Sequence, residues 1–139
     1  MKTYFTLDQI EEVDFSVLAI NSHAKGYKLC WSINKELQLN FEKAEDQIIN
    51  NEMVFSRYTC VTNEGCEYNI IANRSKKGYL IPDQKKVNYF LITNNRNWLK
   101  EKKKFINKIK ENKEVLLAFE LNIEQNKYIE RFIFNDKKN

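Results

Sequence analysis

The chain is poor in the residues that most often build turns and reactive sites. It has three glycines, one proline, three cysteines and a single histidine, His23, among 139 residues. No glycine lies in a GxGxxG or GxxxxGK[ST] pattern, which excludes the glycine-rich loops that cradle nucleotides. No apolar run approaches the roughly 18 residues that cross a bilayer, and acidic residues stand where a signal peptide is apolar. We therefore expect a cytoplasmic protein with no membrane partner.

The cysteines give no sign of a disulfide or a metal site. Cys30, Cys60 and Cys66 cannot all pair within one chain and show no CxxC spacing, so we expect reduced thiols. A closed zinc site typically needs four Cys or His ligands, and the chain has one histidine. We expect neither a metal nor a cofactor.

Composition favours one folded domain that spans residues 1–139. Hydrophobic residues make up 42% and aromatic residues 13% of the chain, which argues against disorder. No repeat and no linker rich in Gly, Ser or Pro divides it. The chain is Lys-rich throughout, so its net charge of +4 is weak evidence for an anionic partner.

Hydrophobic periodicity predicts strands at residues 3–7, 15–20 and 39–43 and a helix at residues 24–38. Asn21 or Ser22 is the expected cap of that helix. Its apolar stripe consists of Leu29, Cys30, Ile33 and Leu37.

A hairpin is predicted around the three-residue loop Asn63-Glu64-Gly65, with Gly65 in the left-handed conformation. This loop length places Cys60 opposite Tyr68 and Tyr58 opposite Ile70, which gathers the apolar side chains on one face. The reverse face would then be solvated. It carries Arg57, Thr59, Glu67, Asn69 and Asn73.

The C-terminal half predicts a central strand at residues 87–93, apolar on both faces, and a helix at residues 96–112 capped by Asn94 or Asn95. Trp98, Leu99, Phe105, Ile106 and Ile109 share one face of that helix. Val115, Leu117, Phe119 and Leu121 alternate on one face of a further strand, and residues 128–134 are predicted as the last strand. The order predicts a single-domain α+β fold, with helices 24–38 and 96–112 packed on a largely antiparallel sheet.

The segment Ile81-Pro82-Asp83-Gln84-Lys85-Lys86-Val87-Asn88-Tyr89 resembles the motif that names the IPExxxVDY family of small bacterial proteins. Asp83 stands where the motif has Glu, and Asn88 where it has Asp. The residues around Asp14, Ser22-His23 and Gly26 to Asn34 also look similar to this family, as does the total length. The resemblance implies a cytoplasmic bacterial protein and supplies no catalytic residues.

Physical chemistry favours a structural role for the motif. Ile81 precedes a proline and should be extended, and Pro82-Asp83 suits the middle of a type I turn. A catalytic interpretation would make Asp83 and residue 88 a carboxylate pair, but Asn88 is an amide and cannot take up a proton at working pH. His23 is expected to be a capping or surface residue.

Residues 96–113 carry a strong local charge. Eight basic and two acidic residues give a local +6, while the rest of the chain sums to −2. This asymmetry indicates either a solvated helix face or an electrostatic footprint for RNA or another polyanion. The candidate polyanion-binding residues are Lys100, Lys102, Lys103, Lys104, Lys108 and Lys110.

Three functional hypotheses follow. The first is a non-catalytic adaptor that binds a protein partner through the hairpin edge or the loop at residues 73–86. The second is an RNA- or polyanion-associated accessory protein that uses the basic helix. The third is an enzyme with a pocket around Asp83, Asn88 and His23. The sequence leaves the partner and a homo-oligomeric state open.

Overall fold

Six antiparallel strands form the main sheet, in the order β2-β5-β6-β7-β1-β8. The computed structural model describes residues 14–124 and 126–134, so the strand predicted at residues 3–7 lies outside the described residues. The six strands are β1 (Ser16–Asn21), β2 (Glu42–Lys43), β5 (Arg57–Val61), β6 (Glu67–Ala72), β7 (Tyr89–Thr93) and β8 (Leu117–Leu121). Strands β3 (Gln47–Ile49) and β4 (Met53–Phe55) form a separate hairpin.

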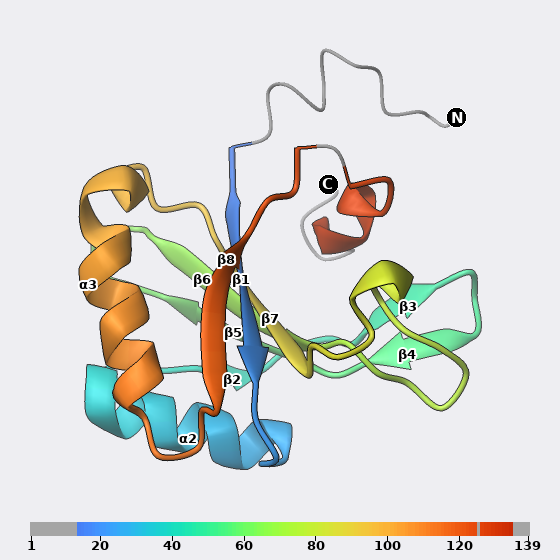
Figure 1. Cartoon of the computed structure of the whole chain (residues 1–139), viewed down its shortest axis with the longest axis horizontal. Helices are drawn as coiled ribbons and strands as arrows, with labels where there is room; N and C mark the ends of the chain where they lie inside the picture. The colour runs from blue at the N-terminus through green and yellow to red at the C-terminus, as the bar shows by residue number, and fades with distance from the viewer. Residues whose placement is uncertain (1–13, 125, 135–139) are drawn as a thin grey trace.

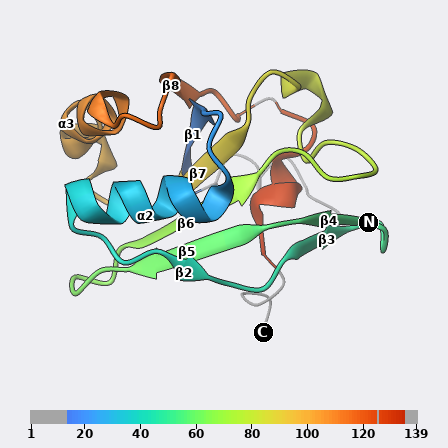
Figure 2. The ribbon, with the colours of Figure 1, turned by 90° about the horizontal axis from the view of Figure 1, so that it is seen from below.

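Two helices, α2 (Gly26–Leu37) and α3 (Trp98–Glu111), pack on one face of the sheet, which confirms the predicted α+β fold (Figures 1 and 2). The other face is covered by irregular segments. These include the short 3-10 helices η1 (Pro82–Gln84) and η2 (Ile129–Phe132). The strand predicted at residues 128–134 is therefore wrong, because this segment folds over the sheet instead of joining it.

Alternation along β1 and β7 sends side chains into both layers. Val17 and Ala19 enter the core beneath the irregular segments, whereas Leu18 and Ile20 enter the core beneath the helices. In β7, Phe90 and Leu91 divide in the same way. The prediction of a strand at residues 87–93 buried on both faces is confirmed in the shorter span Tyr89–Thr93.

The helix caps differ from the prediction. Helix α2 begins after Lys25 and α3 after Asn97, and neither cap makes a side-chain hydrogen bond. Ser22 Oγ instead accepts a hydrogen bond from the Ala24 N–H, at 3.0 Å. Asn95 Oδ1 accepts one from the Asn97 N–H, at 2.9 Å. Ser22 and Asn95 therefore stabilise the turns that precede the helices, and each helix begins more than two residues after them.

The β5–β6 hairpin has the predicted register. Cys60 pairs with Tyr68 and Tyr58 with Ile70, and Gly65 has a φ of 87°. All three cysteines are free thiols.

The predicted solvation of the reverse face of this hairpin is wrong, because the irregular layer covers it. Arg57, Asn69 and Asn73 are buried there. The Arg57 guanidinium donates to Asn69 Oδ1 (2.6 Å) and to the Glu45 carbonyl (3.0 Å), and it stacks on Phe134. Buried polar groups are tolerated when hydrogen bonds replace those made with water.

Apolar side chains in α3 and β8 are less buried than their patterns suggest. Leu99 is 83% exposed although it was assigned to the apolar face of α3. Leu117 and Phe119 do share a face of β8 but are 49% and 37% exposed. Val115 packs in the core beneath the helices, whereas Leu117 and Phe119 lie on the other face of the sheet.

A buried thiol and a partly buried phenol in the helix-side core carry a pH dependence. Burial raises the pKa of the Cys30 thiol to about 12, and burial together with neighbouring Cys30 and Tyr58 raises that of Tyr89 to about 12. Both groups stay neutral in the folded chain at pH values where the unfolded chain has released the proton. Their contribution to stability is complete below about pH 9 and is lost as the pH rises through 12.

We expect Tyr89→Phe to flatten the alkaline loss of stability. The variant should lose about 1 kcal/mol at pH 7, because the Tyr89 hydroxyl donates to the Ala24 carbonyl at 2.7 Å. Its free energy of unfolding should then fall less steeply than that of the wild type between pH 10 and 12. Urea titrations across this range measure both effects, and equal slopes would contradict the assignment.

Candidate functional site

The motif at residues 81–89 shapes the loop that leads into β7. Asn73 holds this loop: its Nδ2 donates to the carbonyls of Gln84 (2.8 Å) and Val87 (2.9 Å), and its Oδ1 accepts from the Ile81 N–H (2.9 Å). Asn88 Oδ1 accepts from the backbone N–H of Ser22 at 2.8 Å. Asn88 is therefore a hydrogen-bond partner of the β1–α2 connection and stands directly before the central strand β7.

Of the three residues of the hypothetical enzyme pocket, Asn88 lies beside the residue that precedes His23 in the chain, whereas the recorded hydrogen bond of Asp83 is to another segment. Asp83 is exposed and accepts a 3.5 Å hydrogen bond from Asn126, while the side-chain oxygen of Asn88 is used by Ser22. His23 is exposed. Within residues 14–124 and 126–134, no group of three or more His, Cys, Asp or Glu side chains is placed to hold a metal ion.

The two edges of the main sheet differ sharply. At one edge, β2 has only two residues, Glu42 and Lys43, and both are charged and exposed. At the other edge, β8 has five residues, of which Glu120 alone is charged. Short, charged edge strands discourage pairing with another chain, and long apolar ones invite it. In the part of the chain that the structure describes, no strand pairs with the outer side of β8, and Glu120 is its single charged residue.

Glu120 gives β8 little edge charge because its carboxylate is engaged with α3. It accepts hydrogen bonds from Trp98 Nε1 (2.9 Å) and Lys102 Nζ (3.0 Å). Burial alone would raise the pKa of Glu120, but these two hydrogen bonds and the positive charge of Lys102 lower it. The contact is therefore present at neutral pH and is lost as the pH falls through the lowered pKa.

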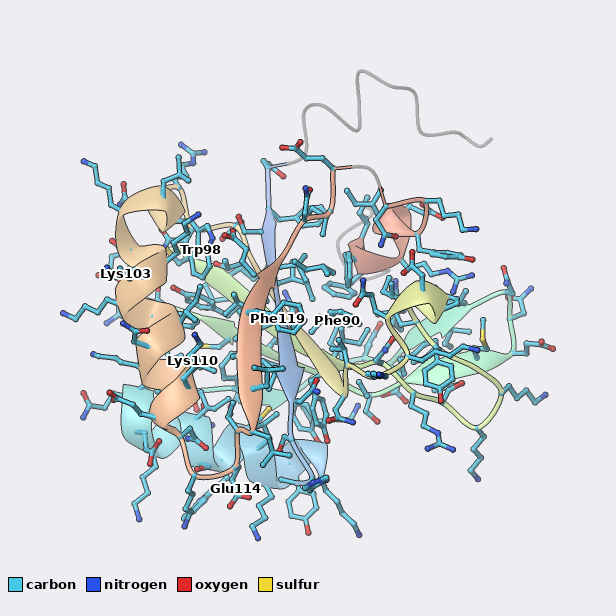
Figure 3. All side chains as sticks on the ribbon, in the orientation of Figure 1. Phe90, Trp98, Lys103, Lys110, Glu114 and Phe119 are labelled. Carbon is cyan, nitrogen blue, oxygen red and sulfur yellow. The ribbon has the colours of Figure 1, made fainter. Side chains whose placement is uncertain are left out.

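One flank of α3 is turned to the free edge of β8. Lys102 reaches Glu120 on the edge strand, whereas Phe105 stacks on Tyr68 of β6, deeper in the sheet. Helical residues advance about 100° each. On that spacing Leu99, Ile106 and Lys110 follow Lys102 around the helix, on the flank beside β8. Figure 3 shows Trp98 between α3 and β8 and Phe119 on the strand.

The remaining lysines of α3 form a second surface, which faces away from the sheet. They line a shallow hollow made by Lys100, Lys103, Lys104, Asn107, Lys108 and Glu111. The predicted basic face is thus divided: Lys102 and Lys110 belong to the β8 flank, and the other four candidates lie on this outer face. Trp98 is buried and Phe105 is partly buried against the core, so neither offers an open ring for stacking on a base.

Sequence reasoning missed two features of the surface. The apolar stripe of α2 is predicted from the sequence, but the exposure of Tyr27 and Trp31, which lie off this stripe, is not. Lys35 Nζ lies 5.2 Å from the centroid of the Trp31 ring. The edge position of β8 was also missed. Its lack of lysine, proline and glycine was the available signal, but that signal has meaning only once the strand order is known.

Comparisons with family models, with curated proteins and with solved structures found no match for this chain. The resemblance of residues 81–89 to the IPExxxVDY motif stays a prediction. No helix among the described residues is long and apolar enough to span a bilayer.

Replacement by aspartate should be tolerated at Asn88 and should destabilise the fold at Asn73. Asn88→Asp keeps the acceptor for the Ser22 N–H at an exposed position, so we expect a change in unfolding free energy within about 0.5 kcal/mol. Asn73→Asp loses both donated hydrogen bonds and buries a charge, which should cost about 3 kcal/mol or more.

Denaturant unfolding of both variants at pH 7 measures these changes. A loss above about 3 kcal/mol in Asn88→Asp would mean that the site needs the amide donor, and it would break the link to the motif with an acid at this position.

Proposed function

We propose that this chain is a non-catalytic protein-binding domain that takes up an extended segment of another polypeptide along the free edge of β8. The observation that carries the proposal is the contrast between the two sheet edges. A five-residue apolar strand whose outer side pairs with no other strand among residues 14–124 and 126–134 can extend the sheet by one more strand.

The two binding surfaces predicted from the sequence, the hairpin edge and the loop at residues 73–86, are less suited to receive a partner strand than β8. The outer strand of the β5–β6 hairpin is paired with β2 at Tyr58 and Thr59, and the Arg57 carbonyl accepts from the Ala44 N–H. The loop at residues 73–86 is held by Asn73 and packs Leu80 and Ile81 into the core. Both segments have backbone groups that are already bonded within the chain.

Polyanion binding remains the second candidate, because Lys100, Lys103, Lys104 and Lys108 gather on the outer face of α3. This surface supplies charge but no exposed ring on the same helix. Sequence-tolerant binding of single-stranded nucleic acid usually combines the two. The β8 edge is therefore the better-supported site.

Site-specific photocrosslinking in the source cells tests the proposal. A photoreactive phenylalanine analogue in place of Leu117 or Phe119 should give discrete protein adducts that resist nuclease. The same analogue in place of Val61, an exposed apolar residue at the end of β5, is the matched control and should give none.

Two results would count against the edge site. One is the same adducts at position 61 as at 117 and 119, which would indicate non-specific contact. The other is nuclease-sensitive adducts from an analogue in place of Lys104 with none at β8, which would favour the polyanion candidate.

A further inference from the structure

We infer that the segment received by β8 is acidic and alternating, with carboxylate side chains on the face toward α3 and apolar side chains on the other face. This inference rests on the proposed function and names the chemistry of its partner. It follows from what lies on each side of the β8 edge.

Side chains of an added strand would alternate between the two faces of the sheet. A residue directly opposite Leu117 or Phe119 would share their face. That face of β8 is apolar, and the irregular layer covers Leu121 while leaving Leu117 and Phe119 exposed. Apolar side chains at every second position of the segment would remove these two from water.

The other face of the added strand would meet the flank of α3. Leu99 and Ile106 supply apolar surface there, and Lys110 supplies a cation for which no ion pair occurs among the described residues. Lys102 lies on the same flank, but its charge is balanced by Glu120, with which it forms an ion pair at 3.0 Å. A cationic flank beside an apolar strand favours a partner with carboxylates at the intervening positions.

A second copy of this chain fits the edge less well. Antiparallel pairing of two β8 strands would place both α3 helices on the same face of the joined sheet. Each helix has six lysines and two glutamates, a charge of +4, so the two basic flanks would repel each other. The same charge attracts an acidic strand. Charge complementarity therefore selects a foreign acidic segment.

Binding of synthetic peptides to the full chain tests the inference. The probe is a fluorescent heptapeptide, Thr-Glu-Val-Glu-Val-Glu-Thr, followed by anisotropy at moderate salt. We expect the version with Lys in place of Glu to bind at least about tenfold more weakly. A shuffled peptide of the same composition should also bind more weakly, because alternation is lost.

Matched charge reversals on α3 locate the cationic flank. Lys110→Glu should weaken binding of the acidic peptide about fivefold, whereas Lys104→Glu, on the outer face, should change it less than about twofold. Phe119→Asp and Leu117→Asp should each abolish binding while circular dichroism shows an unchanged fold.

The outcomes separate the inference from the function on which it rests. Equal binding of acidic and basic peptides, lost in Phe119→Asp, would overturn the acidic preference and leave the edge site intact. Failure of every peptide to bind would overturn both.

Other occupants give their own results. A dimer that dissociates in Phe119→Asp would identify a second copy. Slow amide exchange of the outward-facing N–H groups of β8 in the free monomer would mean that a segment of the same chain already pairs with this edge. Competition by oligouridylate RNA that Lys104→Glu removes would identify a polyanion. Each of these three results overturns the acidic-segment inference.

Discussion

Burial of the central strands on both faces is the constraint on which the rest of the structure depends. Strands β1 and β7 send apolar side chains to both sides, so two covering layers are needed. Helices α2 and α3 supply one layer with internally bonded backbones. The other layer is irregular, and its buried backbone groups need partners from side chains. Asn73, Gln47, Arg57 and Arg131 supply them by donating to backbone carbonyls of the covering segments.

Local rules predicted the parts of this architecture that local rules control. The register of the β5–β6 hairpin follows from the loop length and from Gly65, because a shift by one residue would exchange the two faces. Strand β7 was found because an apolar run flanked by turn residues suits a strand covered on both sides. These features need no knowledge of distant segments.

The prediction failed where distant segments decide. Polar residues at alternate positions indicate solvent, yet Arg57 and Asn69 are buried, because residues from the far end of the chain cover that face. Leu117 and Phe119 show the opposite error. Their alternation is that of a core strand, and they are exposed because β8 is last in the sheet and the described part of the covering layer reaches only Leu121 of this strand. Neither coverage nor strand order can be derived from alternation.

When a basic helix lies beside an apolar sheet edge, the charge of the helix affects which strands can pair with that edge. An open edge strand attracts any unpaired strand, including that of a second copy, and so favours aggregation. Proteins usually counter this with a charge on the strand itself, but Glu120 is turned toward Trp98 and Lys102. The charge that remains beside β8 belongs to α3. In the proposed function, this positive charge would repel further copies of this basic chain and would leave the backbone edge open to an acidic strand. Protection and selection would then come from the same lysines.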